Sequence, residues 1–249
     1  RMTGKTNKRA VLAGLFAGIV VAWCAVCGHA RKITKMSEFW QLKEDMLHVD
    51  RVFEEDIELE IDLDFTKQSL DSPLGANGDT FTGYGGVFDG KGHKVIGLSM
   101  KNNESAGLFE MLIGATIRNL QFDSTCQLVS PVAGMVAPYA EFNVTLENVH
   151  NHGSVSASST AGGLIGTSNA NTTMRRCSNS GRIELTDATG DSTAAGLVGI
   201  VNARPFTLIE DCWNTGDVSA TGGNDVSLAG IVAGIYSSSN TLNNCNNSG

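Results

Sequence analysis

The sequence predicts an all-β fold: a right-handed parallel β-helix whose short repeats stack into a solenoid of three-sided coils, with a short helix capping its N-terminal end. Composition is the first observation. The 249 residues include 29 Gly and only 6% aromatic side chains, which suits short strands and turns but leaves little material for a bulky core. Internal repetition is the second, because two short motifs recur in fixed phase from residue 106 onward.

The first thirty residues have the pattern of a secretory signal peptide. Lys5, Lys8 and Arg9 precede an apolar run over residues 10–26, and small residues follow it. The run is 17 residues long, so an uncleaved signal anchor stays open as an alternative. Either way we expect an extracellular or cell-surface protein whose contact with a membrane, if any, is through this segment.

The charge of the remaining chain excludes some partners. Without the first thirty residues, 14 of the 18 Lys and Arg and all 26 Asp and Glu remain, which gives a net charge of −12. A surface of that sign repels the phosphates of nucleic acid and the headgroups of anionic lipid. We therefore expect neither as a partner of the folded domain.

Residues 31–105 are predicted to form the cap helix and the lead-in coils. Four apolar residues recur at helical spacing: Phe39, Leu42, Met46 and Val49. With Ser37 in position to cap, they predict a helix over 36–49 that covers the open end of the solenoid.

Strict alternation then begins, with apolar residues at 57, 59, 61 and 63, and predicts one strand over 57–64. Its other face carries four carboxylates: Glu58, Glu60, Asp62 and Asp64. Such a row could hold a calcium ion or supply an acid–base pair, and these residues are the sequence's weak metal candidates. We prefer the simpler interpretation of a solvated charged face.

Residues 106–249 are the predicted repeat coils. A small-Gly-apolar-apolar motif occurs five times, with its glycine at Gly107, Gly134, Gly163, Gly196 and Gly230. A second motif ending in Asn-x-Gly follows the last four copies, at residues 149–153, 177–181, 212–216 and 245–249. We expect the first glycine to let the backbone turn closely and Asn-x-Gly to form a turn that tolerates positive φ.

The second motif begins with Val149 in its first copy and with Cys177, Cys212 and Cys245 in the next three. A position shared by valine and cysteine predicts a small apolar slot facing the core, with stacked thiols that are mostly reduced. Disulfide bridging between neighbouring coils stays open. Zinc is less favoured because the repeats have no Cys-x-x-Cys pair.

The stretch 81–98, FTGYGGVFDGKGHKVIGL, followed by Gly107-Leu108-Phe109 and the segment 117–120, resembles proteins that carry the GLUG motif. That resemblance implies a pectate-lyase-like right-handed parallel β-helix of the secreted, adhesin-like type. Glu110 departs from it, since the family usually has a glycine there, and Glu60 replaces a frequent aspartate. Neither change adds a recognisable catalytic group.

Candidate chemistry elsewhere is weak. Asp89-Gly90 is a typical turn pair, so we do not assign catalysis to His93 beside it. No catalytic residue and no cofactor is predicted. Four sites fit the N-glycosylation sequon and would make the chain a glycoprotein in a eukaryotic host: Asn103, Asn143, Asn171 and Asn246.

These observations favour a non-enzymatic extracellular binding or adhesion module that presents a polar, acidic β-helix face to a glycan or a host protein. The alternatives are a carbohydrate-active enzyme of the polysaccharide lyase or hydrolase type, and a structural stalk of a larger surface protein. The last repeat copy stops directly after its Asn-x-Gly at residue 249. We therefore expect a piece of a longer solenoid that is prone to self-association through its final coil.

Overall fold

The computed structural model describes residues 29–249 except 78–79, 170, 189, 203–206, 224 and 237–238. Residues Arg31–Gly249 form one compact unit. The predicted signal segment lies almost entirely outside the described residues. In the described part of the chain, no helix is long and apolar enough to cross a membrane.

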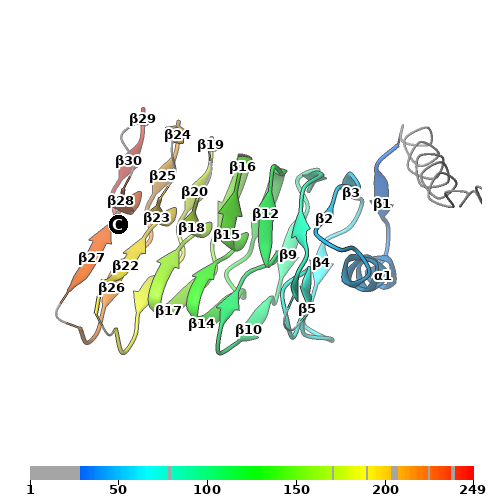
Figure 1. The fold of residues 1–249 in the computed structure, drawn as a ribbon, viewed down its shortest axis with the longest axis horizontal. Coiled ribbons are helices and arrows are strands. Elements are labelled where there is room, and N and C mark those ends of the chain that lie inside the picture. Colours follow the sequence, from blue (N-terminus) through cyan, green and yellow to red (C-terminus); the bar gives the residue numbers. More distant parts are fainter. Residues whose placement is uncertain are drawn as a thin grey trace, which may run out of the picture. The chain divides into compact units, whose positions relative to one another are not determined.

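The unit is a right-handed parallel β-helix of about seven coils, which confirms the predicted fold class. Its coils run from the cap helix α1 (Met36–Leu47) to the strands β27 (Val226–Ala229), β28 (Val232–Ile235), β29 (Asn240–Asn243) and β30 (Asn246–Asn247) at the other end (Figure 1). Among the strands that the structure describes, every pair is parallel except the hairpin of β5 (Ala76–Asn77) and β6 (Thr80–Phe81). Three parallel sheets form the three sides of the coils.

The largest sheet has 13 strands: β1 (Arg31–Ile33), β3 (Ile57–Leu59), β4 (Leu63–Asp64), β8 (Val87–Asp89), β9 (Lys94–Ile96), β13 (Thr116–Phe122), β16 (Asn143–Asn151), β19 (Asn171–Arg175), β20 (Ser178–Asn179), β24 (Thr207–Glu210), β25 (Trp213–Asn214), β29 (Asn240–Asn243) and β30 (Asn246–Asn247). The 8-stranded sheet contains β10 (Ser99–Lys101), β11 (Ser105–Ala106), β14 (Gln127–Gly134), β17 (Ser154–Gly162), β21 (Ile183–Leu185), β22 (Ser192–Ala195), β26 (Val218–Ala220) and β27 (Val226–Ala229). The 7-stranded sheet contains β2 (Val52–Phe53), β7 (Gly83–Tyr84), β12 (Met111–Ile113), β15 (Ala137–Glu141), β18 (Ile165–Ser168), β23 (Val198–Val201) and β28 (Val232–Ile235).

The predicted cap helix forms as α1 (Met36–Leu47) and buries Phe39, Leu42 and Met46, but it ends before Val49, the last residue of the predicted stripe, which is half-buried in the segment that follows. The prediction that Ser37 caps it is wrong, because the N-cap position is Lys35, whose side chain makes no capping bond. The carboxylate of Glu38 instead reaches back and accepts hydrogen bonds from the Thr34 backbone N–H at 2.7 Å and hydroxyl at 3.0 Å. This contact fixes the chain at the start of the helix.

The single strand predicted over 57–64 is divided into β3 and β4 by a bend at residues 60–62. The same sheet bends in the later coils at residues with positive φ between 49° and 55°: Lys91, Asn119, Asn148, Arg176, Asp211 and Asn244. The inserted residue is left out of the pairing, as Asn119 is between Arg118 and Leu120. Side chains on both sides of the bend therefore keep the inward and outward alternation of a strand.

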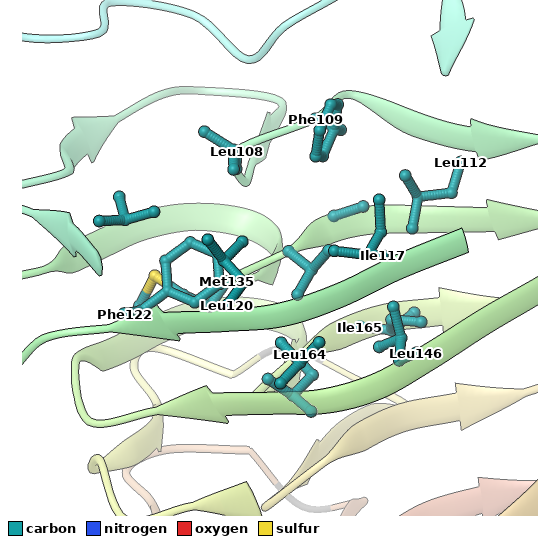
Figure 2. Packing of buried hydrophobic residues seen from close by; sticks show 14 of the residues in the cluster. Leu108, Phe109, Leu112, Ile117, Leu120, Phe122, Met135, Leu146, Leu164 and Ile165 are labelled. Carbon is teal, nitrogen blue, oxygen red and sulfur yellow. The ribbon is translucent and has the colours of Figure 1, made fainter. Parts of the chain in front are cut away.

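The interior is filled by apolar side chains from successive coils (Figure 2). Near the N-terminal end the core is aromatic: Tyr84 stacks on Phe109 with ring centroids 4.9 Å apart, and Phe88 packs edge-on to Phe109 at 5.3 Å. The last coil leaves four large apolar side chains exposed: Leu228, Ile235, Tyr236 and Leu242.

The expectation that Asn-x-Gly forms a turn with positive φ is wrong. The glycines at 153, 181, 216 and 249 are not among the residues with positive φ. Glycine is needed for space instead, because a Cβ on Gly181 would lie 1.8 Å from the carbonyl oxygen of Gly153 in the preceding coil. The asparagine before it points inward: Asn151, Asn179 and Asn214 are buried and linked into a ladder.

The glycine of the small-Gly-apolar-apolar motif also has a steric role. A Cβ on Gly163 would lie 2.0 Å from the Gly196 carbonyl oxygen, and a Cβ on Gly196 would lie 2.1 Å from the Gly230 carbonyl oxygen. The coils do not stack in the register of the motif throughout. Gly134 pairs with Gly162 and not with Gly163, so the motif alignment is offset by one residue at that step.

Candidate functional site

A row of outward-facing polar side chains follows the half of the 13-stranded sheet that lies after the bend. Parallel pairing places one residue from each successive coil in this row: Lys94, Gln121, His150, Ser178, Trp213 and Asn246. We call these six residues the polar strip. It runs from β9 across β13, β16, β20 and β25 to β30, along the direction in which the coils stack (Figure 1).

A shallow groove of about 590 Å³ lies beside the first half of the polar strip. Its lining is entirely polar or charged: Lys94, Gln121, Asp123, Ser124, His152 and Ser180. His152 and Ser180 are both exposed, and the Nδ1 atom of His152 lies 2.6 Å from the hydroxyl of Ser180. The groove therefore presents amide, hydroxyl and imidazole groups that can donate and accept hydrogen bonds.

A chain of hydrogen bonds crosses four coils and fixes the orientation of His150. The side-chain amide of Asn119 donates to the Asp89 carboxylate at 3.0 Å, and the side-chain amide of Asn148 donates to Oδ1 of Asn119 at 3.0 Å. Because the Asn148 amide nitrogen is used in this way, its Oδ1 atom accepts from Nε2–H of His150 at 2.9 Å. Nδ1 of His150 is left to accept the Ser178 hydroxyl at 2.8 Å.

Since a carboxylate only accepts hydrogen bonds, Asp89 sets the direction of the whole chain and holds His150 in its neutral Nε2–H tautomer. Burial lowers the pKa of His150, and the nearby His152 adds to this, so the imidazole stays neutral at pH 7. Burial alone would raise the pKa of Asp89, but hydrogen bonds from Asn119 and the Lys91 amide, with the charge of Arg118, hold it below its usual range.

The fixed imidazole supports an exposed indole. The ring centroids of His150 and Trp213 are 5.9 Å apart with an interplanar angle of 36°, although the two residues lie two coils apart. Ser178, which lies between them in the polar strip, is small enough for the rings to meet across it. Trp213 nevertheless remains 41% exposed. A large, supported aromatic surface is thus open to solvent among hydrogen-bonding groups.

The charges on the other half of the same sheet are largely neutralised. Seven charged residues lie side by side in successive strands of the sheet: Lys32, Glu58, Asp89, Arg118, Glu147, Arg175 and Glu210. From Asp89 onward their charges alternate in sign. Arg118 pairs with Asp89 at 2.9 Å, Arg175 pairs with Glu210 at 3.1 Å, and Arg176 pairs with Glu147. Where two acids adjoin, Lys91 bridges Glu58 at 3.0 Å and Asp89 at 3.6 Å.

The four carboxylates proposed as weak metal candidates do not converge on one point. Glu58 pairs with Lys91, Glu60 pairs with Lys32 at 2.6 Å, and Asp64 accepts from the backbone and hydroxyl of Thr66. Asp62 accepts from the Lys94 backbone N–H at 2.9 Å and lies 3.1 Å from Nδ1 of His93. Among the residues that the structure describes, no three His, Cys, Asp or Glu side chains are close enough to share a metal ion.

The cysteines lie inside the coils, in the column that begins with Leu120 and Val149. Cys177 and Cys212 are buried, Cys245 is half-buried, and all three are free thiols, as is the buried Cys126 of an earlier coil. Burial raises the pKa of Cys126 to about 12 and that of Cys177 well above its usual value. Hydrogen bonds from the Cys177 thiol and backbone lower the pKa of Cys212. A buried thiol of this kind packs as a small apolar side chain.

The four predicted glycosylation sites lie at the surface. Asn103, Asn143 and Asn246 are exposed, and Asn171 is half-buried and donates to the side chain of Asn143 at 2.8 Å. Glu110, which stands where the resemblance has a glycine, is 2% exposed and accepts the Ser105 hydroxyl at 2.8 Å. Burial raises its pKa.

His150, His152 and Trp213 are functional candidates that were not predicted from the sequence. Each stands within a copy of the Asn-x-Gly motif, at a position flanking the inward asparagine. In a strand those flanking positions point outward, so a histidine or tryptophan there was an available signal of a functional surface.

No protein-family model and no curated protein matches the chain. Two solved structures are similar to it. One is a proposed immunoglobulin A1 protease from Bacteroides ovatus, which is 21% identical with a TM-score of 0.62, over 82% of this chain and 72% of that one. The other is named IgA1 Protease and is 14% identical with a TM-score of 0.52, over 77% of this chain but only 18% of that one. At these identities the likeness shows a shared β-solenoid fold.

Proposed function

We propose that the protein is a non-enzymatic extracellular binding module that holds a glycan on the outer face of its 13-stranded sheet. The observation that carries the proposal is the groove, because its lining of amide, hydroxyl, imidazole and single charged groups matches the hydroxyl-rich surface of a sugar. The names of the similar structures, which describe proteases, fit a location outside the cell. The GLUG resemblance points in the same direction.

A glycan array probed with the full chain tests this function. We expect retention of a defined set of glycans by the wild type, and loss of that retention in Gln121→Ala and His152→Ala, whose side chains line the groove. Ser156→Ala, a change in the 8-stranded sheet, serves as the control and should bind normally. Binding of no glycan, or equal binding by all variants, would refute the proposal.

A protease or esterase function is the second candidate, and one observation favours it. The exposed hydroxyl of Ser180 lies 2.6 Å from Nδ1 of His152, which is the distance expected between a nucleophile and its general base. The names of the two similar structures agree with it. A fluorophosphonate probe would label Ser180 if this candidate is correct, and Ser178→Ala would serve as a control at the neighbouring, covered Ser–His pair.

A further inference from the structure

We propose that the ligand is an unbranched chain of uncharged pyranose sugars that lies along the polar strip, parallel to the direction of stacking, with one ring stacked on Trp213. This inference rests on the proposed function. It adds a direction, a substrate class and a specificity-determining residue that the groove alone does not give.

The direction follows from the register of the coils. The groove occupies the coils that contribute Lys94, Gln121, His152 and Ser180, and Trp213 belongs to the coil after that of Ser180. Stacked parallel strands are about 4.8 Å apart, so the strip from Lys94 to Trp213 spans about 19 Å. The groove borders this row on the side of Asp123, His152 and Ser180, so a ligand that reaches from the groove to Trp213 must be elongated and must extend along the axis.

The stacking role follows from how Trp213 is held. An exposed indole on a sheet would ordinarily lose its freedom on binding, at a cost in conformational entropy. Here His150 supports the ring at 5.9 Å, and His150 is itself fixed by Asn148 and Ser178. The indole is thus arranged before the ligand arrives. Its flat apolar face suits a pyranose ring that presents C–H groups on one side.

The polar groups around the indole complete such a site. Asn246 follows Trp213 in the strip, and Thr215 stands two residues after Trp213 in the chain; both are exposed. The next strand and the next outward position thus place an amide and a hydroxyl near the indole, and these groups can bond the equatorial hydroxyls of a stacked sugar. A purely apolar partner would leave these groups without hydrogen bonds.

The absence of charge on the sugar follows from electrostatics. Arg118 pairs with Asp89 and Arg175 pairs with Glu210, so both are already committed, and the exposed Lys94 of the strip lies in the groove together with the carboxylate of Asp123. The chain as a whole carries a net charge of −8. A polyanionic glycan would therefore meet a repulsive field and few available cations. An uncharged chain has no such penalty.

Cello-oligosaccharides are a suitable probe, because every hydroxyl of their β-linked glucose units is equatorial and both faces of each ring are apolar. We expect isothermal titration of the full chain to show affinity rising from cellobiose through cellotetraose to cellohexaose. Trp213→Ala should weaken cellohexaose binding about tenfold and remove the gain with length, while Trp213→Phe should retain most of it. Phe142→Ala, which removes an aromatic side chain that is 69% exposed elsewhere, is the matched control and should have no effect.

The outcomes separate this inference from the function on which it rests. Equal cellohexaose affinity in Trp213→Ala and the wild type would overturn the stacking role, even if Gln121→Ala abolishes binding and so supports the groove. Failure of the wild type to bind cellohexaose would overturn the assigned sugar class, even if the array shows other glycans. Binding of a folded protein partner that Trp213→Ala blocks, without any binding of cello-oligosaccharide, would overturn it as well.

Discussion

Replacing Asn179 with alanine removes the central member of the buried asparagine ladder. Its amide nitrogen donates to the Gly181 carbonyl and to Asn214 Oδ1, both at 2.8 Å. Its own Oδ1 accepts from Asn151 at 2.8 Å and from the Gly181 backbone N–H at 3.2 Å. The substitution therefore removes one hydrogen-bond partner from each of four buried groups: the Gly181 carbonyl, the Gly181 N–H, Oδ1 of Asn214 and the side-chain amide of Asn151.

A buried group left without its hydrogen bond costs on the order of 1–3 kcal/mol. Because some of these four groups keep a second partner, we expect Asn179→Ala to lower the free energy of unfolding by about 4 kcal/mol. Urea unfolding followed by circular dichroism measures this quantity, provided that the slope of the transition is unchanged. Ser180→Ala, the exposed neighbour, is the control and should lie within about 0.5 kcal/mol of the wild type. A loss of less than about 1 kcal/mol in Asn179→Ala would show that the ladder does not hold the coils together as argued.

Three further predictions concern the core and the N-terminal end of the solenoid. Burial raises the pKa of Glu110 in the folded protein, so the ionised carboxylate destabilises the fold above that pKa, whereas below the unfolded-state value near 4.5 the carboxyl is neutral and has no such effect. Glu110→Gln should therefore increase the free energy of unfolding at pH 7 but not at pH 4. An equal increase at both pH values would contradict this prediction. Iodoacetamide should label Cys245 well before Cys177 in the native protein, as mass spectrometry would show, and rapid labelling of Cys177 would contradict its burial. Deletion of residues 36–47 should expose the apolar end and cause aggregation in size-exclusion chromatography, whereas a monomer with unchanged melting temperature would refute the capping role.

The architecture was predictable because it depends on local patterns that repeat. The apolar stripe that includes Phe39 and Leu42 identified the cap helix, and the repeated motifs identified the stacked coils. The details that failed depend on contacts between coils. Glycine in Asn-x-Gly is compatible with positive φ or with close packing, and only the position of the Gly153 carbonyl beside Gly181 distinguishes the two.

The candidate site was less predictable because its residues meet only through the register of stacked coils. His150 and Trp213 are far apart in the sequence, and their contact depends on the number of residues in each of two coils. Alignment of the motif copies would pair Gly134 with Gly163, but in the structure Gly134 pairs with Gly162, one residue earlier. A one-residue error reverses which side chains point outward, so the pairing could not be derived from the motif alone.

Side-chain footprinting tests most directly the claim that the outer face of the 13-stranded sheet is the binding surface. Hydroxyl radicals modify exposed aromatic and histidine side chains, and mass spectrometry locates the modified residues. With cellohexaose bound to the full chain, we predict strong protection of Trp213 and His152 and unchanged modification of Phe142 and Tyr236, which are exposed elsewhere. Protection of Phe142 or Tyr236, with Trp213 and His152 modified as in the free protein, would contradict the claim.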